Sequence, residues 1–212
     1  MPIIVDSYAQ GSPEWFQARL GNPGASNASK IITTKGEPSK QATEYMYQLA
    51  GELIAGKPEE TYQSFNMEKG MEREAEARMV FEMEHEIEVQ QCALVYKDEK
   101  RMFHASPDGL IGDNSGLEIK CPMLKTHVGY LLNGKLPSDY FGQVQMSLYV
   151  TEREHWVFCS YYPDLPMFKI RVERDEKYIK LLAEDIEKFC YELAALVAKL
   201  RGMGCILCVS LS

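Results

Sequence analysis

The chain has 212 residues, the length of one ordinary domain with a sizeable buried core. Hydrophobic residues make up 45% of it and charged residues 25%, which excludes a disordered or fibrous protein. Lysine and arginine total 23 against 31 acidic residues, so the net charge is −8. This charge argues against a protein that coats nucleic acid through a broad basic surface, but it does not exclude one that binds DNA at a local site.

Neither a membrane span nor a secretory signal is expected. No run of about 18 apolar residues occurs, and the first ten residues lack the basic segment and apolar core of a signal peptide. Of six cysteines, only Cys205 and Cys208 have motif-like spacing, and one such pair is too few ligands for zinc or an iron–sulfur cluster. We expect reduced cysteines in a cytoplasmic protein. No linker divides the chain, so residues 1–212 are expected to form a single domain with a tail of unassigned role from about 201.

The sequence pattern predicts helices in the N-terminal part of the chain. Helices are predicted, in chain order, over residues 13–20, 25–32, 41–55 and 66–84. Pro13 suits the first position of the first helix, and Ser26 or Asn27 would cap the second. Gly56 and Pro58 end the third, and residues 35–39 form a loop.

Farther along the chain the sequence pattern changes to short runs rich in β-branched and aromatic residues, bounded by residues typical of turns. These runs predict strands over residues 92–96, 103–105, 117–119, 156–161 and 168–172. Further helices are predicted over 138–150 and 176–200. Helices on both sides of a run of strands indicate an α/β domain with a central sheet.

The residues that carry chemistry lie around two of these strands. In a strand, positions two apart project from one face, so Glu118 and Lys120 point together while Ile119 points away. If the flanking strands pair as a hairpin, Asp108 reaches the same place. Two carboxylates and the backbone carbonyl of Ile119 would form an all-oxygen site for Mg²⁺ or Mn²⁺, and a lysine beside it can orient or deprotonate an attacking water. This is the equipment for phosphodiester hydrolysis.

Plainer interpretations remain open at this point. Ser106-Pro107-Asp108-Gly109 is also a good type I turn, and a Glu-x-Lys strand is a common solvated face. A third carboxylate, Glu74, lies on the apolar side of its helix with Phe81 and needs a partner there. That partner is either a metal ion or Arg78, four residues on. Glu72 and Glu76 fall on a different, solvated face of the helix.

The sequence resembles a known nuclease group. SPDGL at 106–110, GLEIKCP at 116–122 and YFGQVQ at 140–145, preceded by the helical Glu74, are similar to the PD-(D/E)xK nuclease superfamily. Within it, the order of motifs from Trp15 to Tyr178 looks like that of the phage lambda exonuclease group of viral recombination exonucleases, a YqaJ-like family. The resemblance implies a restriction-endonuclease-like core with a central mixed β-sheet flanked by helices.

The resemblance also implies residue roles. Metal ligands would be Asp108, Glu118, the Ile119 carbonyl and Glu74, with Lys120 as the catalytic lysine. A 5′-phosphate pocket would comprise Arg19, Ser26, Ser106 and Gln143, whose donors suit a terminal phosphate. Met67 would be an apolar wedge that splits the last base pairs. Residues 22–24, Asn-Pro-Gly, depart from the family's pattern just before Ser26.

The implied activity is that of an alkaline-type 5′-to-3′ exodeoxyribonuclease with two Mg²⁺ ions per site, Mn²⁺ being an alternative. It would act on double-stranded DNA ends that carry a 5′-phosphate, release 5′-mononucleotides and leave 3′ overhangs for a single-strand annealing protein. The resemblance further implies a ring-shaped homotrimer encoded by a phage or prophage and located in the bacterial cytoplasm.

Two alternatives stand beside this reading: a PD-(D/E)xK endonuclease of restriction or repair type, and an inactive module that binds DNA ends. In either nuclease case, we expect an acidic outer surface with basic residues confined to the DNA path.

Overall fold

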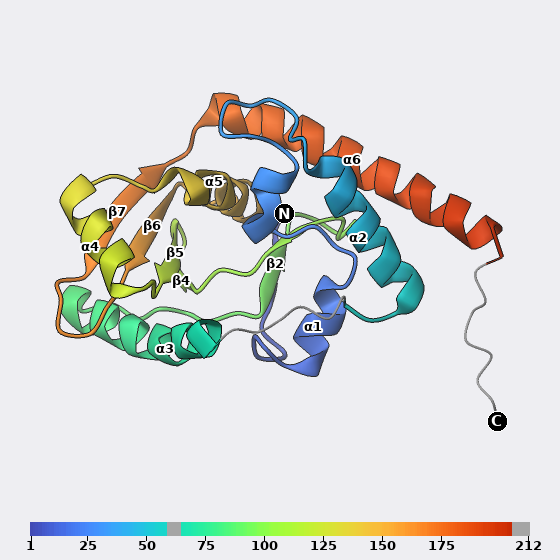
Figure 1. Cartoon of the computed structure of the whole chain (residues 1–212). Coiled ribbons are helices and arrows are strands. Elements are labelled where there is room, and N and C mark those ends of the chain that lie inside the picture. The colour runs from blue at the N-terminus through green and yellow to red at the C-terminus, as the bar shows by residue number, and fades with distance from the viewer. Residues whose placement is uncertain (59–64, 205–212) are drawn as a thin grey trace.

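The computed structural model describes residues 1–58 and 65–204, with the backbone alone over 65–72 (Figure 1). Cys205 and Cys208 lie outside the described residues. The helices are α1 (Pro13–Arg19), α2 (Ala42–Ala55), α3 (Phe65–His85), α4 (Leu124–Asn133), α5 (Ser138–Thr151) and α6 (Glu176–Gly202), with a 3₁₀ helix η1 (Ala25–Lys30). The strands are β1 (Ile3–Val5), β2 (Leu94–Tyr96), β3 (His104–Ala105), β4 (Gly109–Ile111), β5 (Ser115–Lys120), β6 (His155–Ser160) and β7 (Phe168–Glu173).

The strands divide into two sheets. One is antiparallel with the order β1-β2-β3, and the other has the order β4-β5-β6-β7. The second sheet is mixed, because β5 and β6 run parallel while its other pairs are antiparallel. Between β3 and β4 lies Pro107, which has no N–H to donate to a strand ladder, and this accounts for the break. The predicted mixed α/β class is confirmed, with a division into two sheets that the sequence pattern did not indicate.

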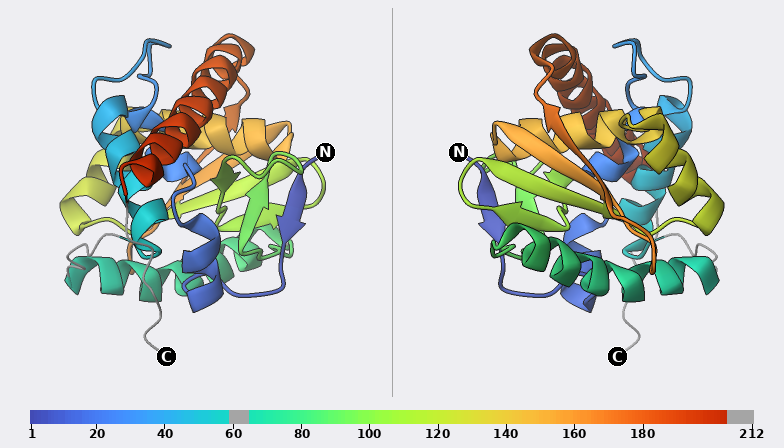
Figure 2. Two further views of the ribbon diagram at one scale, coloured as in Figure 1. Left: turned by 90° about the vertical axis from the view of Figure 1, so that its right-hand side faces the viewer. Right: turned by 90° about the vertical axis from the view of Figure 1, so that its left-hand side faces the viewer.

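Helices cover both faces of the four-stranded sheet. On one face, Ala77 and Phe81 of α3 pack against Leu117 and Ile119 of β5. On the other, α5 and α6 pack with Trp156 of β6 in the larger hydrophobic core. Figure 2 shows α3 and α6 on opposite sides of the molecule. Residues of β5 with odd and even numbers therefore have different neighbours, as the alternation of a strand requires.

Polar contacts of α3 hold this helix against the segment that directly follows β6. The Tyr161 hydroxyl donates a hydrogen bond of 2.7 Å to Glu76, and Arg73 lies 4.8 Å from the ring centroid of Tyr162. Glu76 is exposed, as expected, yet it is also a hydrogen-bond acceptor. That bond is the main reason why the pKa of Tyr161 rises to about 12.

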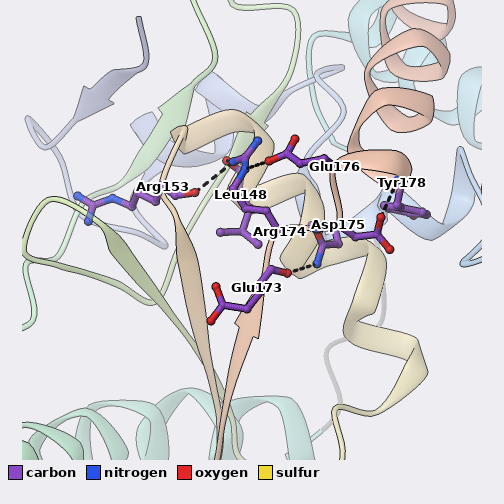
Figure 3. A network of polar contacts seen from close by, with 8 residues as sticks. Leu148, Arg153, Glu173, Arg174, Asp175, Glu176 and Tyr178 are labelled. Atoms are coloured by element: carbon purple, nitrogen blue, oxygen red, sulfur yellow. Dashed lines mark hydrogen bonds and ion pairs between the residues drawn. The ribbon is translucent and has the colours of Figure 1, made fainter.

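Arg174 joins α5, the segment between α5 and β6, and α6 at the junction shown in Figure 3. Its guanidinium donates to the carbonyl oxygens of Leu148 (2.8 Å) and Arg153 (3.1 Å) and pairs with Glu176 (2.6 Å). Asp175 caps α6 by accepting a hydrogen bond of 3.0 Å from the Tyr178 amide. These contacts hold the long C-terminal helix against α5, the helix that carries Gln143.

Most predicted elements are present, with three differences. The segment after Gly24 is a 3₁₀ helix whose N-cap is Gly24 without a side-chain hydrogen bond, so the predicted cap by Ser26 or Asn27 is wrong. The short strands β1 and β4 were not predicted, and neither was the helix α4. In the described part of the chain, no helix is long and apolar enough to cross a membrane.

Candidate active site

A β-hairpin brings Asp108 to the strand that carries Glu118 and Lys120. β4 and β5 pair antiparallel with Gly109 opposite Leu117, and the Asp108 amide donates to the Leu117 carbonyl at 3.1 Å. The Ile119 amide in turn donates to the Asp108 carboxylate at 2.5 Å. The expected hairpin between the strands predicted at 103–105 and 117–119 is wrong, because β3 pairs with β2 in the other sheet and β5 instead forms a hairpin with β4, which was not predicted. Asp108 directly precedes β4, and the backbone of this hairpin holds its side chain beside β5.

Glu118 lies at the centre of the candidate site. Its side chain forms an ion pair with Lys120 and accepts a hydrogen bond of 2.5 Å from the Gln143 amide of α5. Both contacts use Oε1, whereas Oε2 is buried and has no hydrogen-bond partner. Glu118 is only 1% exposed. A buried carboxylate oxygen without a partner is costly, so the site is built to receive a further group there.

Glu74 approaches the same site from α3. It forms an ion pair of 2.8 Å with Arg78, so the pairing considered from the sequence does occur. Burial raises the pKa of Glu74, while the charges of Arg78 and Lys120 counteract part of that rise and Glu118 adds to it. Glu74 therefore shares an electrostatic environment with the β5 residues as well as its own helix partner.

The charge balance within this cluster shifts two further pKa values. The pKa of Asp108 is well above its usual range because of burial and the neighbouring Glu118 and Glu74 carboxylates, against which Lys120 acts. Burial alone would lower the pKa of Lys120, but Glu118 and Asp108 outweigh it and the net shift is upward. Lys120 is therefore a cation at neutral pH as the site stands.

The donor set fits a divalent cation. Carboxylate oxygens are the ligands that Mg²⁺ and Mn²⁺ prefer, and the unpartnered Oε2 of Glu118 and the raised pKa of Asp108 both indicate too little positive charge nearby. Among the described residues, no three acidic, histidine or cysteine side chains already form a metal cluster. Glu74 and Glu118 are instead engaged by Arg78 and Lys120.

The residues singled out for a 5′-phosphate lie in the same pocket. This pocket has a volume of about 840 Å³. Its lining includes Glu74, Asp108, Glu118, Lys120, Arg19, Ser26, Ser106 and Gln143. The structure therefore brings the carboxylates and the expected phosphate-binding residues together. Met67 lies in the first turns of α3, where its side chain is outside the described residues.

Arg19 has the environment of an anion-binding residue. Its guanidinium lies 3.9 Å from the Trp15 ring centroid, and burial lowers its pKa. In the part of the chain that the structure describes, no carboxylate forms an ion pair with it. The Trp15 indole donates to the Ala93 carbonyl at 3.0 Å and to the Ser106 hydroxyl at 3.3 Å. Trp15 thus fixes both Arg19 and Ser106.

Trp15 and His104 also line the pocket and were not among the site residues predicted from sequence. Trp15 could have been found, because it stands four residues before Arg19 on one helix face. His104 gave no signal, since it lies in a strand of two residues. Its ring is 1% exposed, its Nε2 has no partner, and a Cβ on Gly24 would lie 2.8 Å from that atom. Burial, with Arg19, lowers the pKa of His104 to about 3.

Comparison with known proteins identifies the family. Residues 14–154 match the model of the YqaJ-like viral recombinase domain. The chain belongs to this family. It is 32% identical to an alkaline exonuclease from Laribacter hongkongensis, LHK-Exo, over 91% of this chain and 97% of that chain, with a TM-score of 0.82. The structure of LHK-Exo in complex with dAMP matches equally well.

Two more distant relatives extend the comparison. A phage-related exonuclease from Haemophilus somnus 129PT shares the fold, with a TM-score of 0.66 and 12% identity over 84% of this chain and 96% of that chain. The uncharacterized protein ExoD of Escherichia coli (strain K12) is 29% identical over 68 residues, which is 31% of this chain and 78% of that protein. The resemblance to viral recombination exonucleases is confirmed, as are the restriction-endonuclease-like fold and the prediction of an exodeoxyribonuclease.

Proposed function

We propose that the protein is a Mg²⁺-dependent 5′-to-3′ exonuclease that digests one strand of duplex DNA from a 5′-phosphorylated end. The observation that carries the proposal is the shared pocket, which Arg19 lines together with Asp108, Glu118 and Lys120. No carboxylate of the described residues pairs with Arg19. A cation that binds the terminal phosphate places the first phosphodiester bond at the hydrolytic centre, so that one nucleotide is released at a time. The products are 5′-mononucleotides and a 3′ single-stranded overhang.

The carboxylates of Asp108, Glu118 and Glu74 and the carbonyl of Ile119 would hold two Mg²⁺ ions, for which Mn²⁺ can substitute. When bound, these ions supply positive charge that stabilises the attacking and leaving oxygens of the phosphodiester. Asp108 and Glu118 are well suited to this because the hairpin and Gln143 already orient them. The unpartnered Oε2 of Glu118 supplies a ligand atom without breaking any hydrogen bond.

Lys120 handles the attacking water. Its ammonium group projects from the same face of β5 as Glu118, with which it pairs, and lies 5.3 Å from the centroid of the Tyr140 ring. Held in this way, it can orient a water molecule toward the phosphorus and take part in its deprotonation. Gln143 contributes twice, since it hydrogen-bonds Glu118 and lines the space next to Arg19.

Arg19 selects the phosphorylated end. A planar guanidinium binds two oxygens of a terminal phosphate at once, and the hydroxyls of Ser26 and Ser106 offer further donors in the same pocket. Hydrolysis of the terminal nucleotide leaves a new 5′-phosphate, which Arg19 can bind for the next cycle. This supports 5′-to-3′ polarity.

The family supports three further parts of the proposal. The protein would work as a ring-shaped homotrimer around the duplex, with Met67 as the wedge at the fork. It would pass the 3′ overhang to a single-strand annealing protein during phage-type recombination in the bacterial cytoplasm.

The test compares linear and closed circular duplex DNA of the same sequence with Mg²⁺ and with EDTA. The proposal predicts mononucleotide release from the linear form alone, and none with EDTA. Nicking of the circle would favour the endonuclease alternative. Retention of linear DNA without digestion would favour an inactive end-binding module.

A further inference from the structure

Arg78 connects two parts of the chain that carry proposed metal ligands. Its Nη2 donates to the Glu74 carboxylate of α3 at 2.8 Å, and its Nε donates to the backbone carbonyl of Asp108 at 3.0 Å. The side chain is 13% exposed and lines the candidate active site. One guanidinium thus joins the helix to the residue directly before β4.

Arg78 also changes the charge that an incoming cation meets. Three carboxylates, those of Glu74, Asp108 and Glu118, face the pocket together with Lys120. Lys120 pairs with Glu118, and Arg78 pairs with Glu74. With both cations counted the formal charge of this group is −1, and without Arg78 it would be −2. Because the pocket is partly removed from water, a full unit of charge there has a sizeable effect on cation affinity.

We propose that Arg78 is a positioning residue of the metal site and its internal counter-ion. It holds Glu74 against the backbone carbonyl of Asp108 and offsets part of the negative charge that a divalent cation meets in the pocket. Its loss would therefore leave a more negative but less ordered site. This inference rests on the proposed function, because it concerns the same metal site.

The two hydrogen bonds, to the Glu74 carboxylate and to the Asp108 carbonyl, explain why an arginine suits this position. Lysine would keep the charge but could not donate from two separate nitrogens in a fixed plane. Arg73, one turn earlier on α3, provides a contrast, because its guanidinium packs on the Tyr162 ring instead of the carboxylates. The two arginines differ in what they contact while sharing a helix and a charge.

The experiment is a direct titration of the intact protein with Mn²⁺, followed by electron paramagnetic resonance, for wild type, Arg78→Gln, Arg78→Lys and Arg73→Gln. Loss of the competing charge in Arg78→Gln should tighten Mn²⁺ binding roughly fivefold, as expected for one unit of charge in a pocket that water still partly screens. Arg78→Lys should bind Mn²⁺ close to wild type, and so should Arg73→Gln. The kcat of Arg78→Gln and Arg78→Lys should fall about tenfold at saturating Mg²⁺, with the KM for DNA ends unchanged, since Arg19 is untouched.

An unchanged or weaker Mn²⁺ affinity in Arg78→Gln would overturn the inference, even if the protein remained an exonuclease. Equal tightening in Arg73→Gln would do the same, because it would show a general charge effect. Should Arg78→Gln not fold, a kcat for Arg78→Lys equal to that of wild type would contradict the positioning role. Absence of Mn²⁺ binding by the wild-type protein would overturn the metal site itself, and with it the proposed function.

Discussion

At the scale of single residues, the candidate site depends on a few side chains whose surroundings define their chemistry. Glu118 is almost fully buried, is engaged by Lys120 and Gln143 through one oxygen, and offers the other. Arg19 is partly buried, stacks on Trp15 and has no carboxylate partner in the described part of the chain. A partly buried cation without a paired anion favours the proposed binding of a phosphate from outside.

Lys120→Ala should abolish digestion while leaving the binding of DNA ends. The ammonium group is needed to handle the attacking water, whereas Arg19 and its neighbours are untouched. Nucleotide release and end binding are measured on the same labelled duplex, with Lys125→Ala on the exposed side of α4 as the control. Retained turnover in Lys120→Ala would show that another group does this work.

Arg19→Ala should erode the preference for 5′-phosphorylated over 5′-hydroxyl ends. The loss of charge-assisted hydrogen bonds to a phosphate corresponds to roughly 10- to 100-fold in this ratio. Rates on the two substrates are compared for wild type, Arg19→Ala and Arg19→Lys, the last of which should keep part of the preference because it keeps the charge. An unchanged ratio in Arg19→Ala would remove this residue from the phosphate pocket.

At the scale of elements, the common face of Glu118 and Lys120 was predictable, whereas the hairpin partner of β5 and much of the pocket were not. The alternation of a strand alone places Glu118 and Lys120 on one face. The partner strand β4 has three residues and little local signal. Glu74 was ambiguous because a helix position has several neighbours, and it does contact Arg78. The surroundings of Arg19 could not be read from the sequence, because Trp15 reaches partners 78 and 91 residues away.

Elements with weak local signals were the ones missed. β1 has three residues and exists through its pairing with β2. α4 contains Thr126 and Gly129, which are poor helix formers, and is fixed by tertiary contacts. Its buried His127 contacts the Ser160 hydroxyl at 2.8 Å and the Pro166 carbonyl at 3.1 Å. η1 departs from an α-helix at Gly24, where the close approach of His104 excludes a side chain.

The buried His104 of β3 should make the free energy of unfolding depend on pH in the acid range. Burial holds the pKa of His104 at about 3 in the folded protein, whereas an unfolded histidine titrates near 6.5. Between these values the unfolded chain binds more protons, so the free energy of unfolding falls as the pH drops below about 6.5. From pH 7 to pH 5 this one residue contributes a loss of about 2 kcal/mol.

Urea unfolding at pH 7 and pH 5 checks this for wild type, His104→Gln and His85→Gln. His104→Gln should lose about 2 kcal/mol less than wild type over this interval, whatever its stability at pH 7. His85 is exposed, and His85→Gln is the control for loss of a histidine at the surface. If wild type and His104→Gln change in parallel, His104 is not neutral in the folded state.

At the scale of the whole molecule, a net charge of −8 is compatible with DNA digestion. Some charged residues pair with one another at the surface, whereas others line the pocket. Surface cations such as Lys97 and Lys169 pair with Glu152 and Glu84, whereas among the described residues no carboxylate pairs with Arg19. Three further acids line the pocket, where we propose that they bind metal ions. We expect association with DNA to depend on the end and the metal more than on bulk attraction, and hence to have a shallow salt dependence.

The central claim is that one pocket binds the 5′-phosphate and cuts the same strand. The most direct test is a linear duplex with a 5′-phosphate on one strand only and 5′-hydroxyl groups elsewhere, with a different label on each strand. The account predicts that, with Mg²⁺, labelled mononucleotides come first from the 5′ end of the phosphorylated strand while its partner stays intact as single-stranded DNA. Early release from a 3′ end, or equal digestion of both strands, would contradict it.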